Sequence, residues 1–173
     1  AVQGKLVPQD PNDEPASVLL ERIRAEKEKL IKEGKIKKEK NPSVIFRGAD
    51  NLPYEKVGKN EPVCIADEVP FEIPESWEWV RWGTLSESIQ YGYNAPAQEN
   101  GRIKMVRISD IQDNSVLWET VPYCDIRESE IDAYLLKPND ILFARTGGTV
   151  GKSFLVRDVP YEAIYAGYLI RTR

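Results

Sequence analysis

Hydrophobic residues near the N-terminus recur at helical spacing. Between residues 16 and 33, apolar side chains return at steps of three, four and seven residues, which places them on one stripe of a helix. These residues are Ala16, Leu19, Leu20, Ile23, Leu30 and Ile31. Before the stripe, Asn12 or Asp13 can serve as the N-cap, and Pro15 fits the first turn, where a missing N–H costs nothing. We therefore expect an amphipathic helix from about residue 16 into the low thirties.

The apolar stripe has two interpretations. It packs against the chain's own domain, which is the commoner use of such a stripe, or it binds a partner helix as in a coiled coil. In the second case Leu19, Ile23 and Leu30 are the partner-binding residues. About two heptads are too few to decide between them.

The next segment, residues 41–74, is rich in proline. It holds five of the twelve prolines of the chain, at positions 42, 53, 62, 70 and 74. Because proline lacks a backbone N–H and restricts its neighbours, we expect an irregular connector on the surface.

From Trp77 onward, short runs of β-branched and aromatic residues alternate with turn residues. The pattern predicts strands near 79–82, 103–108, 140–145, 151–156 and 163–170, and short helical turns near 84–89 and 128–134. The predicted fold is α+β, a twisted and largely antiparallel sheet preceded by an amphipathic helix. We divide the chain into an N-terminal helical segment (1–40), the connector (41–74) and a sheet domain (75–173).

Composition narrows the chemistry. The chain has 173 residues, a net charge of −4, two cysteines and no histidine. Without histidine there is no Ser-His or Cys-His nucleophile pair, and Cys64 and Cys124 stand outside any CxxC pair, so we expect no catalytic or metal site. No run approaches the roughly 18 apolar residues of a membrane span. We therefore expect a reduced, cytoplasmic protein that is not bound to membranes.

Charge is distributed unevenly along the chain. Residues 16–40 carry a balance of +4 and residues 41–80 a balance of −5, whereas residues 81–173 are nearly neutral. The net charge of the sheet domain therefore does not indicate the kind of partner that it binds. It also does not indicate a surface that attracts DNA strongly.

Two motifs come close to known catalytic patterns. The run Thr146-Gly-Gly-Thr-Val-Gly-Lys-Ser153 resembles a P-loop, but a threonine occupies the first glycine position and the run leads into a predicted strand, whereas a P-loop opens a helix. The run Asn94-Ala-Pro-Ala97 lacks the aromatic residue that a base-flipping methyltransferase needs. We expect neither nucleotide hydrolysis nor methyl transfer, and we interpret the glycine run as a connection between strands whose bare backbone a ligand can approach.

Loop residues with hydrogen-bond donors are better suited to reading nucleic acid. Tyrosine, amide, arginine and lysine side chains on loops and strand ends contact phosphates and base edges. The candidates for DNA binding are Tyr91, Tyr93, Asn94, Gln98, Arg102, Lys104, Arg145, Thr146 and Lys152. The strand alternation around Arg107 indicates that this residue is either paired or at a strand end.

Several blocks, taken in order, resemble the specificity subunits of type I restriction-modification enzymes. They are Gln3-Gly-Lys-Leu-Val-Pro-Gln9, the charged helix from Leu19, Phe71-Glu-Ile-Pro-Glu-Ser-Trp-Glu-Trp-Val80, Val106-Arg-Ile-Ser-Asp-Ile111 and the segment from Leu136 to Lys152. Each block is weak alone, and their ordered combination is specific. The chain opens on Ala-Val-Gln-Gly and stops in a predicted strand, so we expect a fragment containing the front part of a first target-recognition domain.

The resemblance implies a non-catalytic module that reads one half of a split DNA target. It implies double-stranded DNA, methyltransferase subunits and a restriction subunit as partners, with S-adenosylmethionine, ATP and magnesium held by those partners and no cofactor in this chain. The spacer helices that bind the methyltransferase in this family are not present in the sequence. The alternative is a protein-interaction scaffold that assembles through the 16–33 helix without reading DNA.

Overall fold

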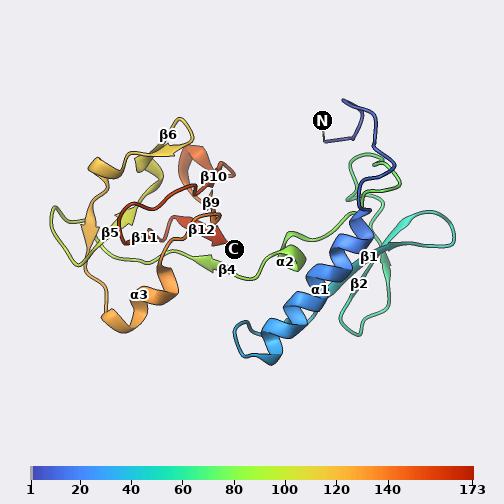
Figure 1. The fold of residues 1–173 in the computed structure, drawn as a ribbon, viewed down its shortest axis with the longest axis horizontal. Helices are drawn as coiled ribbons and strands as arrows, with labels where there is room; N and C mark the ends of the chain where they lie inside the picture. The colour runs from blue at the N-terminus through green and yellow to red at the C-terminus, as the bar shows by residue number, and fades with distance from the viewer. Residues whose placement is uncertain (1) are drawn as a thin grey trace. The chain divides into compact units, whose positions relative to one another are not determined.

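The computed structural model describes residues 2–173, which fall into two compact units. One ends at Leu85 and the other runs from Ser86 to Arg173 (Figure 1). The predicted α+β class, with a helix ahead of mostly antiparallel strands, is confirmed. The boundaries 1–40, 41–74 and 75–173 stay a prediction. No helix within residues 2–173 is both long enough and apolar enough to cross a membrane.

The first unit contains the expected helix, α1 (Ala16–Lys32). Its N-cap is Pro15, so the prediction of Asn12 or Asp13 was wrong. The helix begins at Ala16, and residues 10–13 form a turn ahead of it in which the Asp10 carboxylate accepts the backbone N–H of Asn12 at 2.9 Å. On the apolar stripe Leu20 is buried, whereas Leu19 is 41% exposed.

The segment 41–74, predicted to be irregular, contains regular structure up to Cys64, whereas residues 65–74 form no strand or helix. It forms an antiparallel sheet from β1 (Ser43–Arg47), β2 (Pro53–Val57) and β3 (Val63–Cys64), in the order β1-β2-β3. The prolines are compatible with this sheet because those at 42, 53 and 62 stand just before a strand or at its first residue, where a missing N–H is tolerated.

Arg81 connects the segment just before the short helix α2 (Trp82–Leu85) to strand β2 and to Glu68. Its guanidinium binds the Glu55 carboxylate of β2 through two hydrogen bonds of 2.9 and 2.6 Å and also contacts Glu68 at 2.8 Å. These bonds, with a further one from the Ser43 hydroxyl, lower the pKa of Glu55 to about 2. The predicted strand at 79–82 is absent: most of this run is irregular, and Trp82 begins α2.

The second unit is built on two sheets and a helix. One sheet has the order β10-β9-β12-β4, all antiparallel, from β4 (Ile89–Tyr91), β9 (Ile141–Ala144), β10 (Ser153–Leu155) and β12 (Leu169–Thr172). The other has the order β11-β5-β8, from β5 (Ile103–Val106), β8 (Tyr123–Cys124) and β11 (Ala163–Tyr165), with β11 parallel to β5. Beside them lie the hairpin of β6 (Ile111–Gln112) and β7 (Ser115–Val116) and the helix α3 (Glu128–Tyr134).

Most sequence predictions for this unit hold. The helical turn at 128–134 is confirmed, as are strands near 103–108, 140–145 and 151–156. The segment 163–170 is two strands rather than one, because the chain turns at residues 166–168, where the Leu169 N–H donates to the Ala166 carbonyl. The helical turn predicted at 84–89 is α2, which ends earlier, and Ile89 begins β4 instead.

The core of the second unit lies on both faces of β11. Tyr165 and Ala163 pack with Val106, Leu142 and Leu169, whereas Ile164 packs with a second cluster around Met105. Every residue of β5 and β11 is buried, so neither strand alternates in exposure, and Lys104 of β5 is the one charged residue in the two strands.

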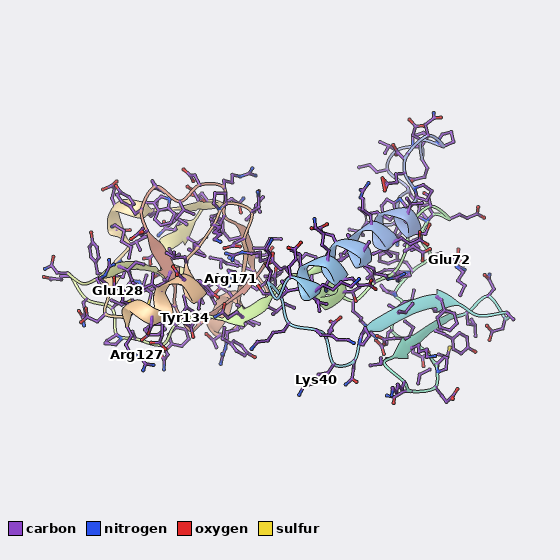
Figure 2. All side chains as sticks on the ribbon, turned by 60° about the horizontal axis from the view of Figure 1, so that its bottom comes forward. Lys40, Glu72, Arg127, Glu128, Tyr134 and Arg171 are labelled. Carbon is purple, nitrogen blue, oxygen red and sulfur yellow. The ribbon has the colours of Figure 1, made fainter. Side chains whose placement is uncertain are left out.

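The buried arginine Arg171 connects β12 to the end of α3. Arg171 donates to the carbonyls of Leu135 and Ala133 at 3.0 and 3.3 Å, and Figure 2 shows it reaching toward the end of α3 near Tyr134. Its guanidinium lies 5.2 Å from the ring centre of Tyr165, whose pKa is raised to about 12 by burial. The C-terminal strand is therefore held in place by polar contacts as well as by apolar packing.

Candidate nucleic-acid interface

Several predicted residues line one groove of the second unit. The groove has a volume of about 560 Å³ and is bordered by the chain after β4, the β9–β10 connection and the turn between β11 and β12. Of the predicted residues, Tyr93, Asn94 and Thr146 line it. We call it the Thr146 groove.

The sheet order explains why these segments meet. β12 pairs with β4 on one side and β9 on the other, so that Ile170 lies opposite both Tyr91 and Phe143. The last residues of β4 and β9 and the first residues of β12 therefore lie side by side at one end of the sheet. The chain after β4 also runs very close to the turn, since a Cβ added at Gly92 would lie 2.1 Å from the Ala166 carbonyl oxygen. Only glycine fits at that position.

The β9–β10 connection is a strand-to-strand loop and not a P-loop. It contains the 3₁₀ turn η3 (Gly147–Thr149) and then leads into β10. Gly147 and Gly151 have φ values of +75° and +83°, which favour glycine. A Cβ built at either of them, or at Gly148, would have no atom within 4 Å, so the loop stands clear of the domain. This confirms the sequence interpretation of the segment as a β-connection with an unshielded backbone.

Arg145 and Tyr91 form an exposed pair where β9 and β4 end, and Arg145 directly precedes Thr146 of the groove. The Arg145 guanidinium carbon lies 4.6 Å from the centre of the Tyr91 ring, and Tyr91 is 61% exposed. The Arg145 backbone N–H donates to the Tyr168 carbonyl at 3.1 Å, which fixes the start of the loop against β12. Tyr168 is itself 63% exposed.

Tyr93 and Asn94 differ in their exposure. Tyr93 is half-buried, its ring packs edge-on against Tyr134 with centroids 5.1 Å apart, and its hydroxyl donates to Glu130 at 3.4 Å. Burial, with the nearby Glu130 carboxylate, raises the pKa of Tyr93. Asn94 is exposed on the wall of the groove. The amide of Asn94 is therefore the more accessible donor of the two.

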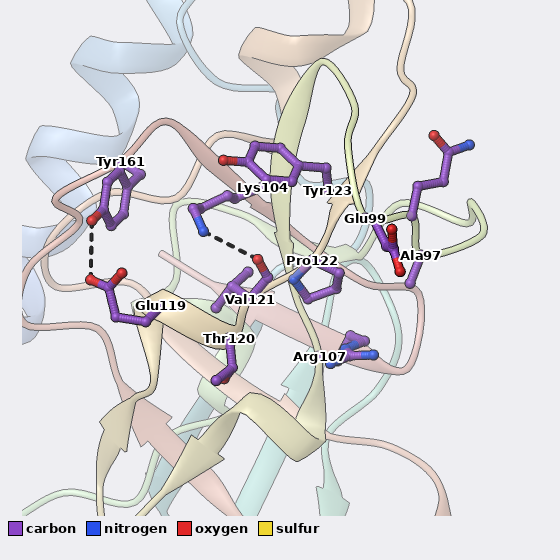
Figure 3. Close-up of a pocket in the computed structure, with 11 residues that line it drawn as sticks. Ala97, Glu99, Lys104, Arg107, Glu119, Thr120, Val121, Pro122, Tyr123 and Tyr161 are labelled. Carbon is purple, nitrogen blue, oxygen red and sulfur yellow. Dashed lines mark hydrogen bonds between the residues drawn. The ribbon is translucent and has the colours of Figure 1, made fainter.

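A neighbouring hollow of about 630 Å³ contains Gln98 and Lys104 (Figure 3). Ala97 and Arg107 line both this hollow and the Thr146 groove, so the two adjoin each other. Arg107 lies directly after β5, and its guanidinium is paired with Asp110 at 2.7 Å, as the sequence predicted. We call this second depression the Lys104 hollow.

The Lys104 ammonium is surrounded by two backbone carbonyls and two tyrosine rings. Its Nζ donates to the carbonyls of Trp118 and Val121 at 3.0 and 3.2 Å and lies 5.0 Å from the ring centres of both Tyr123 and Tyr161. The side chain is buried, with 8% of the residue exposed. Figure 3 shows the ammonium pointing toward the Val121 carbonyl. The Tyr161 hydroxyl in turn donates to Glu119 at 3.2 Å, and that carboxylate raises the pKa of Tyr161.

The remaining predicted residues lie outside the groove. Gln98 joins the hollow to β8 through two backbone hydrogen bonds with Tyr123. Arg102 is exposed and lies 3.7 Å from the Glu128 carboxylate. Lys152 is exposed at the far end of the β9–β10 connection, beside a smaller hollow of about 220 Å³. The structure thus brings Tyr93, Asn94 and Thr146 together and places Gln98, Arg102 and Lys152 outside their groove.

Sequence analysis missed two tyrosines at this surface. Tyr168 lines the Thr146 groove, and Tyr161 lines the Lys104 hollow. The signal for Tyr168 was present as a Gly-Tyr pair in the run 163–170, but the interpretation of that run as one strand hid the turn. Tyr161 follows the turn residues Asp158 and Pro160, and nothing in the sequence relates it to Lys104.

The proposed partner-binding residues of α1 are only partly exposed. Leu19 is exposed, whereas Ile23 and Leu30 are half-buried. Among residues 2–173, no three acidic or cysteine side chains gather in a way that could hold a metal ion.

Comparison with known proteins points to one class. No family model matches the chain. It is 53% identical over 181 residues to the specificity subunit of the type I restriction enzyme EcoEI of Escherichia coli, covering 99% of this chain and 27% of that protein. It is 38% identical over 146 residues to the corresponding subunit of EcoAI, also of Escherichia coli, covering 83% of this chain and 22% of that protein. The chain thus spans about a quarter of the length of these relatives.

Proposed function

Because this chain is homologous to the specificity subunits of type I restriction enzymes, we propose that it is a DNA-reading part of such a subunit. The observation that carries the proposal is the 53% identity extending over 99% of the chain. In this proposal the second unit is the core of a target-recognition domain that reads one half of a split target. The chain performs no covalent chemistry of its own.

The surface of the second unit supports this role. The Thr146 groove and its rim present an amide, hydroxyls, an arginine and bare glycine backbone on loops, which is the chemistry that reads base edges and phosphates. The candidates for direct contact are the exposed residues Tyr91, Asn94, Arg102, Arg145 and Lys152, together with the half-buried Thr146. Lys104 and Tyr93 support the loops that carry these residues, because their polar atoms already have partners in the protein.

The proposal assigns the chemistry to other chains. Methyltransferase subunits would hold S-adenosylmethionine, and a restriction subunit would use ATP and magnesium. A net charge of −4 is consistent with this division, since non-specific affinity for DNA scales with the phosphates that a protein neutralises. The partner chains then provide much of the phosphate contact.

The test uses the complete specificity subunit that contains this chain, assembled with its methyltransferase. The methylation pattern of the source genome first defines the split target, and fluorescence anisotropy then compares that duplex with one whose half-site is scrambled. Specific binding should exceed non-specific binding by at least about 10³-fold. Equal affinity for both duplexes would refute the proposal.

A further inference from the structure

Arg145 differs from its neighbours in how its guanidinium is held. The Tyr91 ring lies 4.6 Å from the guanidinium carbon, and within residues 2–173 no hydrogen bond or ion pair engages the guanidinium N–H groups. A cation held over an aromatic ring is stabilised without using its N–H donors. The five donors of Arg145 therefore remain available to a ligand.

Most other arginines of the second unit have already used their donors. Arg107 is bound to Asp110, Arg127 to Glu130 and Arg173 to Asp140, each at 2.7 to 2.8 Å. Such pairs orient loops and helices and leave little for a ligand. Arg145 is thus held in position and has free donors at the same time.

The surroundings of Arg145 allow a large ligand to approach. It directly follows β9, and the loop after it carries Gly147 and Gly148, where an added Cβ would have no atom within 4 Å. The exposed Tyr168 lines the adjoining Thr146 groove, and its backbone carbonyl accepts the Arg145 backbone N–H. Bare backbone beside an arginine permits close contact with the edge of a DNA groove.

We propose that Arg145 reads a guanine of the half-site by donating two hydrogen bonds to its O6 and N7 atoms, with Tyr91 as the positioning residue for the guanidinium. The inference rests on the proposed function and specifies the base that Arg145 recognises. Arginine with guanine is the commonest specific pairing in the major groove because the planar fork of donors matches the two acceptors.

The stacked geometry suits the reading of a base. Two hydrogen bonds to one base edge require a fixed direction for the planar guanidinium, and the Tyr91 ring supplies that direction. Tyr91 limits the freedom of the side chain before DNA binds and so reduces the conformational entropy lost on binding. The exposed Lys152 at the other end of the same loop has the chemistry expected for the phosphate contact.

The experiment measures binding of the complete subunit, assembled with its methyltransferase, to target duplexes in which each guanine in turn is replaced by 7-deazaguanine, which lacks the N7 acceptor. In the wild-type complex we expect one guanine of this half-site at which the replacement lowers affinity several-fold. In Arg145→Ala that replacement should have no further effect, and affinity for the unmodified target should fall roughly 5- to 150-fold. A wild-type complex insensitive to every replacement overturns the inference without any variant.

Matched variants separate reading from general attraction. Arg157→Ala removes another exposed arginine of the same unit and should leave the pattern of sensitive guanines unchanged. Tyr91→Ala should weaken the response at the same guanine, and Tyr91→Phe, which keeps the ring, should restore it. Sensitivity that persists in Arg145→Ala at every guanine overturns the inference while leaving sequence-specific binding intact, whereas a wild-type complex without sequence preference refutes the proposed function itself.

Discussion

Replacing Lys104 with methionine should destabilise the second unit strongly although the variant keeps most of the apolar stem. The ammonium donates two hydrogen bonds to the Trp118 and Val121 carbonyls. Hydrogen bonds from a charged donor contribute roughly 1.5–3 kcal/mol each, and a cation over an aromatic ring contributes about 0.5–1 kcal/mol or more. Relief from burying a charge offsets part of this loss, so we expect a net decrease of about 2–4 kcal/mol in the free energy of unfolding.

Urea denaturation followed by tryptophan fluorescence measures this change. With a slope of about 2 kcal/mol per molar urea, the midpoint should move down by roughly 1–2 M. Lys152→Met is the matched control, because it removes an exposed lysine of the same unit and should change stability by less than about 0.5 kcal/mol. If Lys104→Met unfolds within 0.5 kcal/mol of the wild type, the ammonium is not held by these partners and the reasoning fails.

Three further outcomes follow from the contacts. Lys152→Ala should lower DNA affinity about equally for all sequences and reduce the salt slope of binding by roughly one unit, and a change confined to one base position would contradict a phosphate contact. The depressed pKa of Glu55, about 2 in the folded chain, means that its contribution is fully present above pH 4.5 and is lost as the pH falls toward 2, so stability measured between pH 2 and 7 should fall less steeply in Glu55→Gln than in the wild type. Gly92→Ala should lower the melting temperature markedly because the new Cβ meets a backbone oxygen, while Gly148→Ala, which enters open space, should leave it within a degree or two; equal shifts would argue against the close approach.

The helix and most strands of the chain were predictable from local pattern. The helix α1 shows apolar residues at helical spacing. The strands β5, β9 and β10 are runs of β-branched or aromatic residues bounded by turn residues, and both patterns are visible in neighbouring positions. The strands between residues 43 and 64 were not predictable from proline content, because each of the prolines at 42, 53 and 62 lies where a strand begins, and there the missing N–H does not interrupt the sheet.

The site was predictable in its residue types and only partly in its arrangement. Arg145 and Tyr91 are visible in the sequence as candidate ligands of nucleic acid, but their pairing required β12 to lie between β4 and β9, two strands about fifty residues apart along the chain. Lys104 was an equally reasonable phosphate ligand by sequence. Its burial depends on the carbonyls of η2 (Trp118–Thr120) and Val121 and on Tyr161, which only the fold places around it.

The sequence alone showed the resemblance to specificity subunits and the inventory of available chemistry, since the absence of histidine is a property of composition and the ordered blocks are properties of neighbouring residues. Tertiary structure alone decided which donors are free. Whether an arginine or lysine can read a ligand depends on whether a carboxylate, a carbonyl or a ring already holds it, and those partners come from distant parts of the chain. Arg145 and Lys104 are equivalent cations in the sequence, and their surroundings make one available and the other a part of the core.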